Sequence, residues 1–281
     1  MKVNIRKTLF LIVKGGIIGI ANIIPGVSGG TLAVVLGIYD RLIAAISGFF
    51  TQPDMRWAHF RFLAKIFTGA AVFILLLANL MDYMLNEHYS ATMFLFSGLI
   101  IGGIPAVIRS HHDMKPGYRR AAMLAAGALF IVLLPESVND AAVSSGVISS
   151  PAPGGYLLLA LGGFLAGGAM IVPGVSGSFI LLILGQYENI VKAIKGFDIV
   201  ILAIVGIGAV LGIVVFSRMI YILLKKFPAF TYYFILGLIA GSLVRIFPGV
   251  PGSVPRIFIA FLAAAAGFIT AFAISIRESE K

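Results

Sequence analysis

The chain has 281 residues, of which 60% are hydrophobic and 11% charged, and so apolar a chain cannot cover itself with polar surface as a soluble domain does. Its formal charge of +10 would suit a nucleic-acid partner, but the Lys and Arg residues stand in short clusters between apolar runs, as in membrane proteins. The absence of cysteine excludes disulfides and thiolate metal sites, and the histidines lack ligand-like spacing, so we expect no cofactor, metal or nucleic acid.

The first apolar run follows a basic N-terminus and resembles a signal peptide. Lys2, Arg6 and Lys7 precede it, but no small-residue cleavage site follows and the apolar character continues to Tyr39. We therefore expect this segment to be retained.

Two long apolar runs, Gly15 to Tyr39 and Ala141 to Tyr187, are each interrupted near the middle by proline and glycine. Proline lacks a backbone donor and glycine lacks a side chain, so a helix should stop and restart at Pro25 to Gly30 and at Pro173 to Gly177. Lys14 is expected to mark where the buried arm of the first run begins. The other apolar runs approach the roughly 20 residues that a spanning helix needs. We expect spans at about 62–83, 91–108, 119–135, 199–224, 229–246 and 256–276.

The two breaks are copies of each other. At a spacing of 148 residues, Pro25, Gly26, Val27, Ser28 and Gly29 fall on Pro173, Gly174, Val175, Ser176 and Gly177. Further along, at a spacing of 139, Gly98, Leu99, Ile100 and Gly102 match Gly237, Leu238, Ile239 and Gly241. The chain is thus predicted to be a duplication, with repeats at 1–140 and 141–281 and broken hairpins at about 8–48 and 155–196.

Basic residues favour one topology for these repeats. If each broken run is a re-entrant hairpin, each half crosses three times, the halves are inverted, and most cations fall on the cytoplasmic side with the N-terminus. The cytoplasmic cations would be Arg41, Arg56, Arg61, Lys65, Arg109, Lys115, Arg119, Arg120, Lys225, Lys226, Arg277 and Lys281. The alternative, in which the breaks are kinks in crossing helices, would place the cations from Arg41 to Lys65 outside.

Irregular backbone at membrane depth survives only where protein buries it or a wet cavity solvates it. Inverted-repeat transporters bring such breaks together near the midplane, with helix N-termini directed at an anionic group. The predicted substrate site consists of Pro25, Gly26, Ser28, Gly29, Gly30, Thr31, Pro173, Gly174, Ser176, Gly177 and Ser178. In the structural alternative, these glycines only allow two hairpins to pack closely.

Four charged residues are further candidates by position. Arg218 lies inside a span and Arg41 follows the first break, so both are predicted to bind substrate, although Arg218 could instead reach the interface. Asp40 and Glu188 occupy equivalent repeat positions and could couple transport to a proton or sodium ion, or simply mark the headgroup level.

The strings ANIIPGVSGGTLAVVLGIY, from Ala21 to Tyr39, and AMIVPGVSGSFILLILGQY, from Ala169 to Tyr187, resemble the polyprenyl-phosphate transporter family. The resemblance implies a flippase that returns undecaprenyl phosphate, the lipid carrier of cell-wall sugars, across the cytoplasmic membrane of a bacterium. It also implies the lipid as partner, with oligomeric state left open.

Two other functions fit parts of the pattern. A carrier of a small anion could use the same cradle. A membrane lipid phosphatase could share duplicated hairpins, but Ser28 and Ser176 have no adjacent acid or histidine to activate a hydroxyl, so we do not expect an enzyme. No phosphate-binding loop with Lys and Ser or Thr is present, which argues against ATP hydrolysis.

Overall fold

The computed structural model describes residues 5–24, 26–109, 114–135 and 153–279, and within these ranges every regular element is a helix. The elements are α1 (Ile5–Ala21), α2 (Gly29–Val35), α3 (Tyr39–Thr51), η1 (Pro53–Met55), α4 (Arg56–Glu87), α5 (Tyr89–Arg109), α6 (Tyr118–Val132), α8 (Pro153–Ile171), α9 (Gly177–Ile183), α10 (Tyr187–Lys195), α11 (Ile199–Lys226), α12 (Pro228–Ile246) and α13 (Val254–Ser279).

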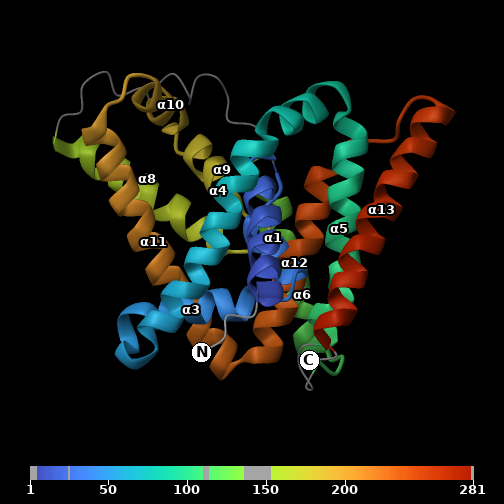
Figure 1. Ribbon diagram of the computed structural model, residues 1–281, viewed down its shortest axis with the longest axis horizontal. Helices are drawn as coiled ribbons and strands as arrows, with labels where there is room; N and C mark the ends of the chain where they lie inside the picture. Colours follow the sequence, from blue (N-terminus) through green and yellow to red (C-terminus); the bar gives the residue numbers. More distant parts are fainter. Residues whose placement is uncertain (1–4, 25, 110–113, 136–152, 280–281) are drawn as a thin grey trace.

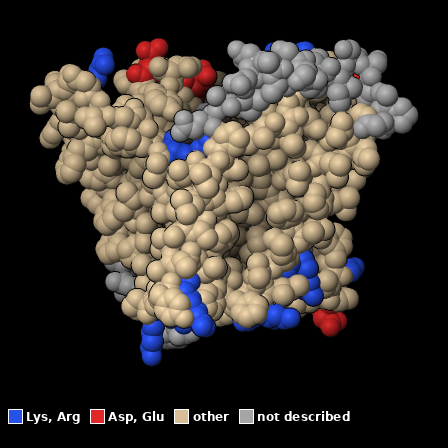
Figure 2. Space-filling view, turned by 180° about the vertical axis from the view of Figure 1, so that it is seen from behind, with Lys and Arg blue, Asp and Glu red and all other residues tan. Residues whose placement is uncertain are grey.

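Four described helices are long and apolar enough to cross a membrane: α4 with the preceding η1, α11, α12 and α13. The apolar parts of α5 and α8 are shorter, and α2 with α3 would make a fifth span only as a bent pair. Figure 2 shows charged side chains near the two ends of the molecule, with a broad uncharged belt between them. The chain is therefore an all-α polytopic membrane protein, as its composition predicts.

The helix after each break is shorter than the hairpins expected at about 8–48 and 155–196. In the first hairpin, α2 ends at Val35 and the chain bends by 119° before α3. In the second, α9 ends at Ile183 and α10 begins at Tyr187. Gly37 sits at the bend before α3 with a φ of +68°, a conformation that glycine adopts without strain. α3 is thus a separate helix rather than a continuation of α2.

Glycines let α1 pack against α4, and α8 against α11, at backbone contact. A Cβ added at Gly15 would lie 2.2 Å from the Ile66 carbonyl oxygen, and one at Gly163 would lie 2.3 Å from the Val205 oxygen. The two contacts are equivalent in the predicted repeat. These glycines allow close helix contacts, because any larger residue would push the helices apart.

The remaining long helices pair between the two halves of the chain. α5 packs on α13, where a Cβ at Gly98 would lie 2.0 Å from the Ala264 oxygen. α12 packs on α6 in the same way, with Gly237 against the Leu124 oxygen at 2.0 Å. The halves therefore interlock, and neither could be removed without stripping a helix partner from the other.

The short helices that follow the two broken segments lie far apart. Figure 1 places α3 at one end of the bundle and α10 at the opposite end, with α11 running between them. This placement is the geometry that inverted hairpins would require. Whether the repeats at 1–140 and 141–281 are inverted in a membrane remains a prediction.

Candidate functional site

The two breaks have the same backbone geometry. The first break, residues 22–28, joins α1 to α2, and the second break, residues 172–176, joins α8 to α9. Gly26 and Gly174 have φ values of +80° and +82°. Ser28 and Ser176 precede the next helix with φ and ψ of −103° and 132°, and −98° and 132°. The duplicated sequence thus folds into duplicated structure; Pro25 lies outside the described residues, whereas Pro173 is buried.

The two breaks contact each other inside the helix bundle. The Gly174 N–H donates to Thr31 Oγ1 at 2.7 Å, and Ser28 Oγ donates to the Val172 carbonyl oxygen at 3.4 Å. Tyr39, just after α2, donates its hydroxyl to the Ile171 oxygen at 3.1 Å. The structure therefore brings the two predicted halves of the site together. We call this contact the crossing.

Glycine is needed at the crossing for close approach. A Cβ at Gly30 would lie 3.1 Å from the Ile171 oxygen, and one at Gly174 would lie 2.7 Å from the Leu238 oxygen. Gly29 donates its N–H to the side-chain oxygen of Asn22 at 3.1 Å. The backbone amides of Gly29 and Gly174 are thus satisfied within the protein in this conformation.

The two copies differ in burial. All seven residues of α2 are buried, whereas only Gly177 is buried in α9. Tyr39 is 3% exposed and its counterpart Tyr187 is 42% exposed. Ser178 is exposed and its hydroxyl lies 2.8 Å from that of the half-buried Ser176. Ser28 and α2 are therefore more deeply buried than Ser176 and α9, although Asn22 and Gly26 of the first break are exposed.

Comparison with known proteins identifies the family. The family model described as VCA0040-like, undecaprenyl phosphate translocase-like, matches residues 18–253. The chain belongs to this translocase-like family. It is 32% identical to the polyprenyl-phosphate transporter of Staphylococcus aureus over 96% of both chains. It is 34% identical to the polyprenyl-phosphate transporter of Vibrio cholerae serotype O1 over 84% of this chain and 76% of that protein. No solved structure matches the chain.

The two arginines predicted to bind substrate, Arg218 and Arg41, have their described contacts outside the crossing. Arg218 donates to Ser47 Oγ on α3 at 3.4 Å and stacks on Tyr221, 5.7 Å from the ring centroid. Arg41 stacks on the Phe62 ring at 4.3 Å. Neither guanidinium is hydrogen-bonded to a break residue in the described part of the chain.

The two equivalent acidic residues have different surroundings. Asp40 accepts a short hydrogen bond from the hydroxyl of Tyr232 on α12, which is buried. Glu188 lies 3.9 Å from Lys192 on the exposed face of α10. An exposed pair of this kind contributes little to stability. Of these two acidic residues, Asp40 is hydrogen-bonded to another helix, α12, whereas the described partner of Glu188 lies in its own helix.

Lys14 makes a buried polar contact that the sequence did not lead us to expect. Burial in α1 begins at Lys14, as expected, but Lys14 is itself only 1% exposed. Its ammonium donates to the Leu36 oxygen at the end of α2 at 2.6 Å. A cation there complements the negative end of the helix. The sequence contained one sign of this contact. A lysine inside an apolar helix is expected to have a partner or a function.

Proposed function

We propose that this chain is a flippase for undecaprenyl phosphate or a similar polyprenyl phosphate, and that the phosphate headgroup passes through the crossing. The observation that carries the proposal is the contact between two duplicated breaks, of which the first is followed by a fully buried helix, α2, and the second by a more exposed helix, α9. A headgroup needs polar groups at membrane depth, and the breaks supply hydroxyls and backbone amides there. The printed names of the relatives support the same substrate class.

The difference in burial supports a mechanism of alternating access. In this conformation α2 is fully buried and α9 is largely not. In a second conformation, open toward the other face, α9 would be buried and α2 exposed. Exchange of these two environments would present one site first to one side of the membrane and then to the other. The prenyl tail would remain in lipid throughout, because the outer surfaces of α4, α11 and α13 are apolar and exposed.

The surroundings of the serines favour transport over hydrolysis. Ser28 bonds a backbone carbonyl and Ser176 bonds Ser178, so among the described residues neither hydroxyl is hydrogen-bonded to a base that could activate it as a nucleophile. The clusters of cations favour a cytoplasmic N-terminus in the bacterial cytoplasmic membrane. Asp40 is the favoured residue for coupling to a proton or sodium ion, since its bond to Tyr232 links α3 to α12.

The proposal is tested with purified protein in sealed vesicles of neutral phospholipid. Undecaprenyl phosphate is placed in both leaflets, and a soluble phosphatase added outside cleaves the lipid exposed there. We expect the protected inner pool to become accessible only in vesicles that contain the protein. An inner pool that stays protected would contradict the proposal, and uptake of inorganic phosphate instead would favour a small-anion carrier.

A further inference from the structure

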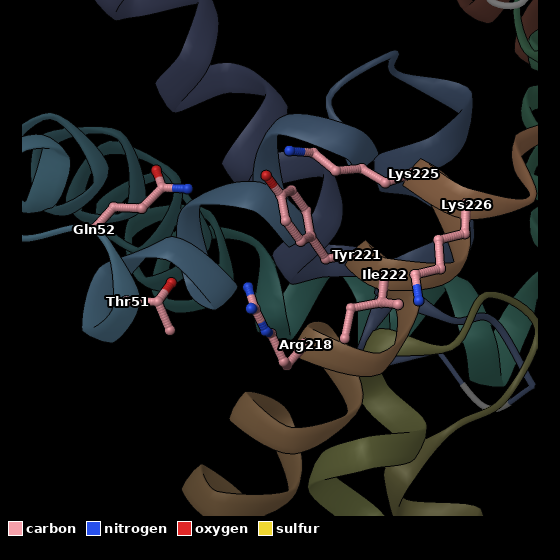
Figure 3. A pocket seen from close by; sticks show the side chains of 7 residues that line it. All are labelled: Thr51, Gln52, Arg218, Tyr221, Ile222, Lys225 and Lys226. Carbon is pink, nitrogen blue, oxygen red and sulfur yellow. The ribbon is translucent and has the colours of Figure 1, made fainter.

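A basic groove lies between the end of α3 and the last turns of α11. It encloses about 410 Å³ and is lined by Thr51, Gln52, Arg218, Tyr221, Ile222, Lys225 and Lys226. In Figure 3, Arg218, Tyr221 and Lys225 extend from α11 toward Thr51 and Gln52, while Lys226 turns away. The groove contains none of the residues of the two breaks, so it is distinct from the crossing.

The cations of the groove stand apart from the acidic residues that the structure describes. Within the described ranges, no carboxylate forms an ion pair with Arg218, Lys225 or Lys226. The structure gives the Arg218 guanidinium one hydrogen bond, to Ser47, so most of its five donors remain available. The Lys225 ammonium lies over the same Tyr221 ring, 4.8 Å from its centroid. Positive charge, a guanidinium fork and a hydroxyl together suit a phosphate.

The repeat provides an internal comparison. At the predicted spacing of 139 residues, Arg218, Tyr221, Lys225 and Lys226 correspond to Asn79, Asp82, Asn86 and Glu87 on α4. α4 keeps the same packing on its partner helix without these cations. The basic groove is therefore not required by the duplicated scaffold. A general preference for Lys and Arg on the cytoplasmic side would explain why these residues are positively charged. It would not explain why three of them line the same groove.

Apolar surface adjoins the groove. Ile222 forms part of its wall, and Val215, Met219 and Leu223 on the same helix expose 51%, 48% and 38% of their surface. A prenyl chain attached to a phosphate in the groove could therefore lie along α11 in the lipid. A free phosphate ion would gain nothing from this surface.

We propose that this groove binds a phosphate monoester at the membrane surface and serves as a docking site for the headgroup of the polyprenyl phosphate. This inference rests on the proposed function. Arg218 and Lys225 bind the phosphate oxygens. The Tyr221 ring positions both side chains through cation–π contacts. Arg218 thus meets substrate in the groove rather than at the crossing.

The test compares binding by the full chain in nanodiscs of neutral phospholipid. The probes are fluorescent undecaprenyl phosphate, inorganic phosphate as competitor and neutral undecaprenol. In the variant Arg218→Gln/Lys225→Gln, we expect affinity for the lipid phosphate to fall about tenfold or more, since two charge-assisted hydrogen bonds are lost. Arg218→Lys/Lys225→Arg should retain most of the affinity, which guards against simple misfolding. The matched control is Lys195→Gln/Arg256→Gln, which removes two exposed cations elsewhere and should leave the affinity unchanged.

Each outcome decides one point. Unchanged affinity of Arg218→Gln/Lys225→Gln, with wild-type protein that still moves the lipid in vesicles, would overturn the groove and leave the proposed function intact. Wild-type protein that neither binds nor moves the lipid would overturn the proposed function itself. If inorganic phosphate binds as tightly as the lipid and displaces it, the groove is a site for free phosphate and the docking role is wrong.

Discussion

The Gly174 N–H and the Thr31 hydroxyl are joined by a 2.7 Å hydrogen bond between residues 143 positions apart in the sequence. Thr31 is 1% exposed, so water does not replace this contact. The bond ties the second break to the first helix turn after the first break. It is the shortest described polar link between the two breaks and sets the geometry of the crossing.

Replacing Thr31 by Val should weaken the crossing. The substitution preserves the shape of the side chain but leaves the partly buried Gly174 N–H without its acceptor, which costs up to about 1–3 kcal/mol. We expect slower lipid movement in vesicles and a lower melting temperature in detergent. Thr31→Ser keeps the hydroxyl and should retain most of both properties. Equal behaviour of the Val and Ser variants would show that the hydrogen bond is unimportant.

Replacing Gly174 by Ala should be more damaging than replacing another glycine. Gly174 has a φ of +82°, where an L-residue costs roughly 1–2 kcal/mol, and the new Cβ would lie 2.7 Å from the Leu238 oxygen. Gly206→Ala on α11 is the matched control, because a Cβ there meets nothing within 4 Å. In a helix interior this control should be neutral or stabilise by about 0.5–1 kcal/mol. Melting temperatures of the two variants provide the test, and the same value for both would contradict the account.

The difference in burial between the two serines can be measured directly. The chain has no cysteine, so Ser28→Cys and Ser176→Cys each create a unique thiol. A small water-soluble maleimide should label residue 176 faster than residue 28, because Ser28 is 3% exposed and Ser176 is half-buried. Undecaprenyl phosphate should slow labelling at residue 176. Equal rates that do not respond to the lipid would contradict alternating access at the crossing.

Asp40 and Glu188 form a second matched pair. If Asp40 couples transport to a cation, Asp40→Asn should abolish the acceleration produced by a proton or sodium gradient. Glu188→Gln should leave it unchanged, since Glu188 contacts only Lys192 on an exposed surface. Gradient-driven movement of the lipid in vesicles is the measurement. Identical loss in both variants would show that the asymmetry of the acidic residues has no functional meaning.

Much of the fold follows from the sequence for simple reasons. A proline next to glycine favours the end of a helix, so the breaks at Pro173 and around Gly26 were predictable from local chemistry. Glycine pairs four residues apart, such as Gly15 and Gly19, have another effect, because a missing side chain lets two helices approach closely. The duplicated string also predicted that both breaks would share one backbone geometry, and the φ values of Gly26 and Gly174 agree within 2°.

The asymmetry of the site was not predictable. Ser28 and Ser176 have the same adjacent residues in sequence, and their different burial arises from the helices that pack around them. The burial of Lys14 depends on the end of α2 reaching it across a turn, which no local pattern specifies. Arg218 was predicted from its depth along α11, but its contact with α3 arises from tertiary packing. Local chemistry thus predicted the breaks, and only the packed molecule shows how they meet.

The most direct test of the central claim is the rate of undecaprenyl phosphate movement through the variant Ser28→Ala/Ser176→Ala, compared with Ser253→Ala/Thr270→Ala, which removes two exposed hydroxyls away from the crossing. If the headgroup passes between the breaks, the first variant should remain folded and lose about fivefold or more of the rate, the equivalent of roughly 1 kcal/mol, while the second keeps it. A normal rate in Ser28→Ala/Ser176→Ala would contradict passage through the crossing.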